Sequence, residues 1–223
     1  MILYVILVII LLFGASYMFS KSESFDTLFY TTDDYPQLKI LEDNWEIIAS
    51  EIPYFDINNL DKFPKRSKSA WMNAEGENLI TNMKSEWVQG WQGDKIWYNF
   101  PLIYKNNIID QSDKICPKTI NLLKQINSIQ IAGYSLLLPH SKLTIHTDTT
   151  GKKYNSMASN FLLTPNNANI YIKNNNGKFI KYKHNLGKIV IFDATNEHYA
   201  DNDDNKIRVI LYIDLGTETN TKL

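Results

Sequence analysis

The chain has 223 residues and a formal net charge of −1 at pH 7, with 23 basic and 24 acidic side chains mixed along its length. This balance leaves no basic surface field, so we expect no nucleic-acid partner. The single cysteine, Cys116, excludes an intramolecular disulfide and a cysteine-rich zinc site, and we expect it to be a small packed side chain. The length suffices for one domain with a sizeable core.

The N-terminal segment differs in composition from everything that follows. Residues 2–19, ILYVILVIILLFGASYMF, carry no charged side chain and are long enough for a minimal membrane helix. A cleaved signal peptide is the alternative, but no basic segment precedes the run and GAS is a weak cleavage site. We therefore expect residues 1–20 to be a transmembrane anchor (or signal peptide) of a single-pass membrane protein. The flanking charges do not fix the side of the membrane.

A polar linker is expected at residues 21–34, followed by one domain over residues 35–218 and a short tail at residues 219–223. Near the start of this domain, residues 53–110 are rich in Trp, Tyr, Asn and Gly. This composition predicts loops with one or two strands.

Two helices are predicted in the first half of the domain. DDYPQLKILEDNWEIIASEI places apolar side chains at helical spacing, with Asp33 or Asp34 as its cap. A second helix is predicted from Pro117 through KTINLLKQI, with Ser112 or Asp113 upstream as a cap.

From residue 128 onward, short segments rich in β-branched and aromatic residues alternate with turn residues. The segments are SIQIAGYSLLL, KLTIHTD, SNFLLT, ANIYIK, KFIKYK, KIVIFD and IRVILYIDL. NNNG at residues 174–177 is a hairpin signal, and Gly187 ends the next link. So many short strands predict a mainly β fold, either a double-sheet jelly roll or a barrel, whose mouth commonly holds a ligand.

His146 and Asp148 stand two apart in one predicted strand, so their side chains share a face. His198 follows at the end of KIVIFDATNEH, and Arg208 lies in the last predicted strand. Two imidazoles and one carboxylate are the set with which non-haem Fe(II) oxygenases hold one face of an ion, leaving positions for a cosubstrate and O2. We therefore predict that His146, Asp148 and His198 bind iron. Arg208 is the predicted partner of the far carboxylate of 2-oxoglutarate, which a guanidinium can bind bidentately.

Each of these residues also has an ordinary structural role. A histidine and an aspartate on a strand can face solvent, and a lone arginine is more often an ion-pair partner than a ligand clamp. The four residues together, in this order and within a predicted jelly roll, favour an iron site. His140 and His184 lack partners at useful spacing, so we expect a strand-edge residue and a solvated turn residue, respectively.

Several segments, strongest after residue 115, resemble the aspartyl/asparaginyl β-hydroxylase family of Fe(II)/2-oxoglutarate-dependent dioxygenases. They are CPKTINLLKQI, LLPHSKLTIHTD, LLTP and GKIVIFDATNEHYADNDDNKIRVILYIDL, within a match from about residue 36 to 215. The resemblance implies a double-stranded β-helix (jelly-roll) core with flanking N-terminal α-helices. It implies His146 and His198 as iron ligands and Arg208 as the ligand of the cosubstrate. Membrane-anchored members occur in the family, which agrees with the predicted anchor.

Two positions concern the family pattern directly. Animal peptide hydroxylases of the family carry glycine at the position of Asp148, whereas bacterial lipid A hydroxylases carry H-x-D, so the triad is complete in this chain. The family's Arg-x-His pair on the next strand aligns with Met157 and Ser159. We therefore expect the near carboxylate of 2-oxoglutarate to be held differently, with Ser159 or Tyr134 as candidates.

The resemblance implies a hydroxylase that uses Fe(II), 2-oxoglutarate and O2 to hydroxylate a C–H bond. A peptide Asp or Asn side chain is the first candidate substrate, and a lipid acyl chain is the second, favoured by the complete triad and the predicted anchor. A non-catalytic, membrane-tethered jelly-roll module that binds sugar or peptide is a third alternative. Trp87, Trp91 and Trp97 are candidates for the wall of the substrate mouth, although tryptophans are more often core residues.

Overall fold

The structure is a computed structural model that describes residues 27–65, 84–90, 95–148 and 156–216. The predicted anchor, Trp91 and the predicted tail lie outside these ranges. Within them, no helix combines the length and the apolar composition that crossing a membrane requires.

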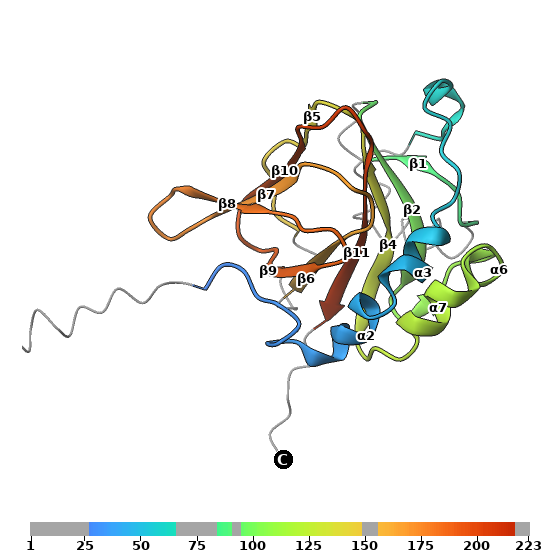
Figure 1. Ribbon diagram of the computed structural model, residues 1–223, viewed down its shortest axis with the longest axis horizontal. Coiled ribbons are helices and arrows are strands. Elements are labelled where there is room, and N and C mark those ends of the chain that lie inside the picture. The colour runs from blue at the N-terminus through green and yellow to red at the C-terminus, as the bar shows by residue number, and fades with distance from the viewer. Residues whose placement is uncertain (1–26, 66–83, 91–94, 149–155, 217–223) are drawn as a thin grey trace, which may run out of the picture.

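Two antiparallel sheets form most of the described structure (Figure 1). The larger sheet has the order β1-β2-β4-β11-β6-β9, with β3 beside β2. Its strands are β1 (Val88–Gln89), β2 (Trp97–Tyr104), β3 (Asn107–Ile108), β4 (Ile129–Leu137), β6 (Ser156–Leu162), β9 (Ile189–Asp193) and β11 (Arg208–Gly216). The smaller sheet has the order β5-β10-β7-β8 and consists of β5 (Ser141–Lys142), β7 (Ala168–Lys173), β8 (Phe179–Lys183) and β10 (His198–Asn202).

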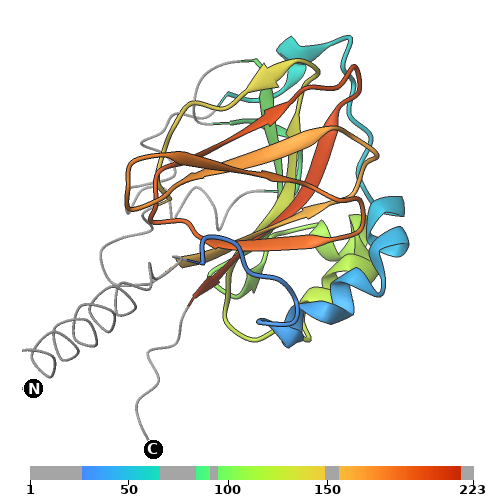
Figure 2. The ribbon, with the colours of Figure 1, turned by 60° about the vertical axis from the view of Figure 1, so that its left-hand side comes forward.

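From β4 onward the chain crosses repeatedly between the two sheets. The first and last of these strands, β4 and β11, pair in the larger sheet, followed by β6 and β9, while β5, β10, β7 and β8 form the smaller one. This is the strand order of a double-sheet jelly roll, and Figure 2 shows the two sheets facing each other. The prediction of a mainly β fold is confirmed, and the sequence pattern did not predict β10.

Short helices cover the face of the larger sheet that points away from the smaller one (Figure 1). They are η1 (Pro36–Leu38), α2 (Lys39–Glu42), α3 (Trp45–Ser50), η2 (Leu60–Lys62), α6 (Ser112–Ile115) and α7 (Pro117–Leu123). Leu38, Leu41 and Ile48 are fully buried, as their helical spacing predicts. Cys116 is also fully buried, and burial raises the pKa of its thiol to about 12, in agreement with a packed structural role.

Both predicted helices are shorter than expected, and their predicted caps are wrong. The first divides between α2 and α3, where the Asn44 side chain donates to the carbonyl of Ile40 at 2.8 Å. Asp34 accepts a hydrogen bond from the backbone N–H of Thr31 at 2.9 Å, so it closes a turn upstream of the helix. Ser112 begins a helix of its own, α6, and its hydroxyl donates to the carbonyl of Ile109 at 2.7 Å. Local turn chemistry of Asp, Asn and Ser therefore overrides the helical periodicity.

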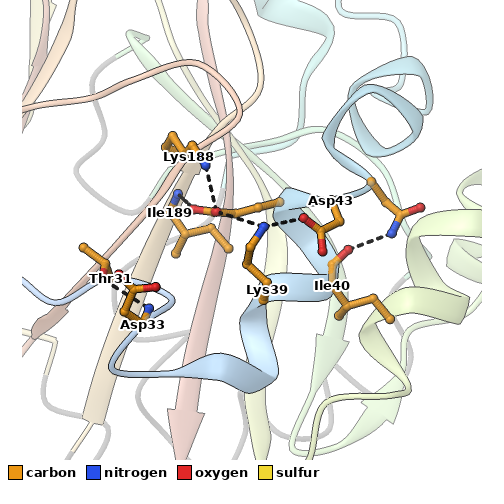
Figure 3. A network of polar contacts seen from close by, with 9 residues as sticks. Thr31, Asp33, Lys39, Ile40, Asp43, Lys188 and Ile189 are labelled. Atoms are coloured by element: carbon orange, nitrogen blue, oxygen red, sulfur yellow. Dashed lines mark hydrogen bonds and ion pairs between the residues drawn. The ribbon is translucent and has the colours of Figure 1, made fainter.

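A buried carboxylate, Glu42, ties the helical layer to the jelly roll. It accepts hydrogen bonds from the backbone N–H of Ile189 at 3.0 Å and from Nζ of Lys188 at 3.1 Å. Figure 3 shows Lys188 and Ile189 converging on this point, beside the exposed pair of Lys39 and Asp43. The contact fixes α2 against the start of β9.

One predicted hairpin turn is confirmed, and one predicted strand is wrong. The NNNG hairpin is confirmed, because β7 and β8 pair across it and Gly177 has a φ of 77°. The continuous strand predicted for KLTIHTD is wrong, since ladder pairing in that segment ends with β5. Beyond β5, His146 forms an isolated antiparallel bridge with His198.

The two faces of the larger sheet have different neighbours. Along β11, alternate residues pack in the core under the helices: Val209, Leu211, Ile213 and Leu215. The residues between them line a cavity of about 650 Å³ on the opposite face: Arg208, Ile210, Tyr212 and Asp214. The cavity also contacts residues of the smaller sheet, such as Ile170 and Ala200, so it lies inside the jelly roll.

Candidate metal centre

The structure brings together the three residues predicted to bind a metal. One ligand atom from each of His146, Asp148 and His198 lies within 4.8 Å of the other two. The backbones of His146 and His198 exchange two hydrogen bonds, of 3.0 and 2.9 Å, which place the histidines directly opposite each other. The N–H of Asp148 donates to the carbonyl of Ala194 at 2.9 Å, so the loop after β9 holds the aspartate beside them.

Backbone carbonyls orient both imidazoles. Nδ1 of His146 lies 2.7 Å from the carbonyl oxygen of Thr144, and Nδ1 of His198 lies 2.8 Å from that of Asn196. Because a carbonyl only accepts, Nδ1 carries the proton in the neutral form of each ring, and Nε2 then presents its lone pair. The two Nε2 atoms lie 3.8 and 3.6 Å from the carboxylate oxygens of Asp148. This is the outer-shell arrangement that fixes histidine ligands of metal ions.

Tyr212, on β11, contacts the carboxylate of Asp148. Its hydroxyl donates to Oδ2 of Asp148 at 3.1 Å. Burial and the nearby charges of Asp148 and Asp214 hold the pKa of Tyr212 well above its ordinary value, so the phenol remains a donor. Burial alone would raise the pKa of Asp148, but when the imidazoles are protonated, the hydrogen bond and charge of His198, together with the charge of His146, hold it below its ordinary value. An ionised carboxylate and two imidazole nitrogens form a donor set that suits Fe(II) and leaves coordination positions open.

Residues of both sheets line the cavity next to the triad, including Trp97. The Trp97 indole N–H donates to the hydroxyl of Ser135 at 2.8 Å, which fixes the ring in the wall, as predicted. Trp87 belongs instead to the core under the helices, where its N–H donates to the carbonyl of Pro53 at 3.2 Å. Trp87 is therefore excluded from the mouth.

Arg208 lies in the same cavity and is only 1% exposed. Its Nε and Nη2 have no hydrogen-bond partner among the described residues. Burial lowers the pKa of Arg208 to about 10, an effect that the charge of Asp201 partly offsets, so the side chain remains a cation at neutral pH. A buried cation with unsatisfied donors is costly unless an anion binds it.

Neither residue proposed for the near carboxylate directs its hydroxyl into the cavity, which corrects both predictions. Ser159 lies on the helix-facing side of β6, and its hydroxyl donates to the carbonyl of Ile213 at 3.4 Å. The Tyr134 hydroxyl points to the helical layer, where it donates to the carbonyl of Ile48 at 3.1 Å and lies 3.0 Å from the hydroxyl of Thr119. Asn160, one position after Ser159, lines the cavity instead.

The prediction for His184 was also wrong. It was expected to be a solvated turn residue, yet it is 2% exposed, and neither ring nitrogen has a hydrogen-bond partner among the described residues. Burial, together with the charge of Arg208, holds the pKa of His184 well below its ordinary value. Its backbone N–H donates to the carbonyl of Ala168 at 3.0 Å, directly after the β7–β8 ladder, a pairing that the local sequence does not predict. His140, by contrast, is exposed, with Nε2 2.7 Å from the Asn205 side-chain oxygen.

Comparison with known proteins gives one family and several more distant relatives. The family model described as "Aspartyl/Asparaginyl beta-hydroxylase" matches residues 42–217. An uncharacterised protein of Acanthamoeba polyphaga mimivirus is 29% identical over 197 residues, which cover 85% of this chain and 70% of the viral protein.

Two solved structures share low similarity with this chain. One is an oxidoreductase of the 2OG-Fe(II) oxygenase family from Burkholderia pseudomallei, with 12% identity and a TM-score of 0.45, covering 64% of this chain and 77% of the other. The second is a Pseudomonas putida prolyl-4-hydroxylase, with 12% identity and a TM-score of 0.40, covering 59% and 77% of the two chains. Similarity at this level adds nothing to the assignment, which follows from the family match over most of the chain. The chain belongs to the aspartyl/asparaginyl β-hydroxylase family.

Proposed function

We propose that the protein is an Fe(II)- and 2-oxoglutarate-dependent dioxygenase that hydroxylates a C–H bond. The observation that carries this proposal is the meeting of three metal-binding side chains, His146, Asp148 and His198, at the edge of a cavity that also contains the buried Arg208. Membership of a hydroxylase family supports the same conclusion. In this proposal the triad holds Fe(II), and Arg208 binds the far carboxylate of 2-oxoglutarate.

The residues of the chain prepare the site for that chemistry. The carbonyls of Thr144 and Asn196 keep the two imidazoles in the tautomer that can bind a cation. The Asp148 carboxylate supplies a negative charge, and Tyr212 holds its orientation. When bound, Fe(II) with 2-oxoglutarate and O2 supplies the oxidation, which converts the cosubstrate to succinate and carbon dioxide and adds one oxygen atom to the substrate. The walls of the cavity position the reactants and exclude water.

We propose a peptide Asp or Asn side chain as the substrate, following the family description. A lipid acyl chain is the second candidate, because the triad includes the aspartate and an apolar run stands at residues 2–19. In either case we propose that residues 1–20 anchor the enzyme in a membrane. A binding module without catalysis is disfavoured, since it would need neither the oriented triad nor the buried guanidinium.

The test uses the full-length protein in detergent or nanodiscs, with Fe(II), 2-oxoglutarate and O2. Succinate should form slowly even without a prime substrate, and the metal-free protein should form none. Incubation with an Asp- and Asn-containing peptide library, and separately with a lipid extract, should then give a mass gain of one oxygen in one of the two. Failure to bind Fe(II) and to form succinate in either incubation would refute the oxygenase and favour the binding module.

A further inference from the structure

A second basic side chain, His184, is buried at the end of the smaller sheet, which faces the sheet that carries Arg208. Both side chains are almost fully buried, and each has nitrogen atoms without a hydrogen-bond partner among the described residues. Burial holds the pKa of His184 well below its ordinary value, and the charge of Arg208 acts in the same direction. Two buried basic groups with unsatisfied nitrogens, on facing sheets, suit an anion better than a packed core.

The strand register places the two residues at the same level of the barrel. His184 donates its backbone N–H to Ala168, and Ala168 pairs with Asn202 on the other side of β7. The Asn202 side chain donates to the carbonyl of Leu137 at 3.1 Å, and Leu137 pairs with Arg208 in the larger sheet. His184 and Arg208 therefore belong to one layer of side chains, contributed by facing sheets.

Among the described strands of the smaller sheet, Asp201 is the one acidic residue, and it does not face this layer. Asp201 is the acidic group whose charge acts on Arg208, but its neighbours His198 and Ala200 line the cavity in alternation with Tyr199, so Asp201 belongs to the outer face. There its Oδ1 accepts a hydrogen bond from the side chain of Asn169 at 2.7 Å. The contact between Asp201 and Asn169 on the outer face leaves the nitrogens of Arg208 and His184 available to a ligand.

We propose that His184 is the second donor of the pocket for the far carboxylate of 2-oxoglutarate and thereby selects a dicarboxylic over a monocarboxylic 2-oxo acid. The inference rests on the proposed function and adds a specificity residue to it. A carboxylate accepts about four hydrogen bonds. The guanidinium of Arg208 offers two donor atoms without a partner among the described residues, Nε and Nη2, and the neutral imidazole of His184 adds one N–H without adding a second buried charge.

A structural role and a binding role predict opposite effects of removing the imidazole. A buried polar group without a partner destabilises the fold, so an apolar side chain of similar size in its place should leave the melting temperature equal or higher. The same change should weaken the binding of a ligand that uses the imidazole. His184→Leu therefore separates the two roles.

The experiment measures dissociation constants for 2-oxoglutarate and for pyruvate by calorimetry on the full chain loaded with Mn(II). For His184→Leu we expect about 10-fold weaker binding of 2-oxoglutarate, as for one lost hydrogen bond, with unchanged pyruvate binding and no drop in melting temperature. His184→Asn should restore part of the affinity, because the amide keeps a donor. His140→Leu, a change at an exposed histidine, is the matched control and should alter neither constant.

Unchanged 2-oxoglutarate affinity in His184→Leu, with the wild type binding normally, would overturn the inference and leave the proposed function standing. Absence of 2-oxoglutarate binding to the wild type would instead refute the proposed function. If His184→Leu fails to fold, the test uses the wild type loaded with Zn(II) and labelled with 15N-histidine, and it records the imidazole NMR signals. The buried imidazole that does not bind metal should shift with 2-oxoglutarate and not with pyruvate, and equal or absent shifts would contradict the assignment.

Discussion

The two faces of the larger sheet use the same strands in different ways. On the helix-facing side, polar groups are few and satisfied, as in the Tyr134 hydroxyl, which contacts Thr119 and the Ile48 carbonyl. On the cavity-facing side, Arg208 keeps donor atoms without a partner among the described residues, and Asn160 and Asp214 add further polar groups. Adjacent residues of one strand thus belong to two environments, about 650 Å³ of cavity on one side and packed core on the other.

This difference assigns separate roles to neighbouring side chains. A face whose polar groups are satisfied contributes to stability, because every donor already has its acceptor. A face with buried unsatisfied groups reduces stability and is expected where a ligand completes the hydrogen bonds. Substitutions on the two faces should therefore separate the free energy of unfolding from ligand affinity.

The largest effect is expected on the helix-facing side of β6. Phe161 is fully buried in the core, and Phe161→Ala should lower the free energy of unfolding by about 3–5 kcal/mol, the usual loss for a buried aromatic side chain. Denaturant-induced unfolding of the wild type and the variant measures this loss of stability. Asn160→Ala, one position away on the cavity side, should change stability far less. Equal losses in both variants would contradict the separation of the two faces.

Arg208→Ala should weaken 2-oxoglutarate binding by about 2–5 kcal/mol, as for truncation of other buried charged partners. Calorimetry on the metal-loaded protein measures the change. Arg208→Lys should recover only part of the affinity, because an ammonium lacks the planar fork of the guanidinium. An unchanged dissociation constant in Arg208→Ala would remove this residue from the cosubstrate site.

Tyr212→Phe should reduce metal affinity by about 10- to 100-fold, the usual consequence of losing an outer-shell hydrogen bond. The hydroxyl that it removes donates to Asp148. A competition titration with a metal chelator measures the affinity. Ser159→Ala, which removes a hydroxyl on the opposite face, is the control and should leave metal affinity unchanged; a loss in both variants would point to a general effect on the fold.

The smallest effect concerns pH. The pKa of His184 is lowered in the folded state, chiefly by burial and then by Arg208. Between that lowered value and the ordinary value of 6.5, the unfolded chain binds a proton that the folded chain does not. Stability should therefore fall as the pH drops below about 6.5, by up to about 1.4 kcal/mol per pH unit. His184→Leu should remove part of this slope in chemical unfolding curves; an identical slope would refute the contribution.

The sequence pattern predicted most strands because alternation and turn residues act locally. Six of the predicted strands lie close to β4, β6, β7, β8, β9 and β11. HYADN was missed as β10 because it mixes polar and apolar residues without a clear alternation, and its pairing with β7 fixes it as a strand. KLTIHTD has strand composition, yet most of it lacks ladder partners.

The triad residues could be proposed from their spacing, whereas the walls of the site could not. Ser159 and Asn160 differ by one residue in register, which places their side chains on opposite faces of the strand, and only Asn160 lines the cavity. His184 lies in KHNLG, whose turn composition predicts exposure. Its burial depends on the facing sheet, which contributes Arg208 and is distant in sequence. Long-range packing therefore decides which polar residues are buried.

The central claim is that His146, Asp148 and His198 hold one ferrous ion next to a 2-oxoglutarate site. The direct test is an anaerobic titration of Fe(II) into the full-length protein in the presence of 2-oxoglutarate. The readout is the visible charge-transfer absorption of Fe(II) and 2-oxoglutarate bound together. We expect the band to saturate at one ion per chain, to persist in His140→Ala, and to vanish in His146→Ala and in His198→Ala. A band of equal intensity in either of those last two variants, or no band in the wild type, would contradict the account.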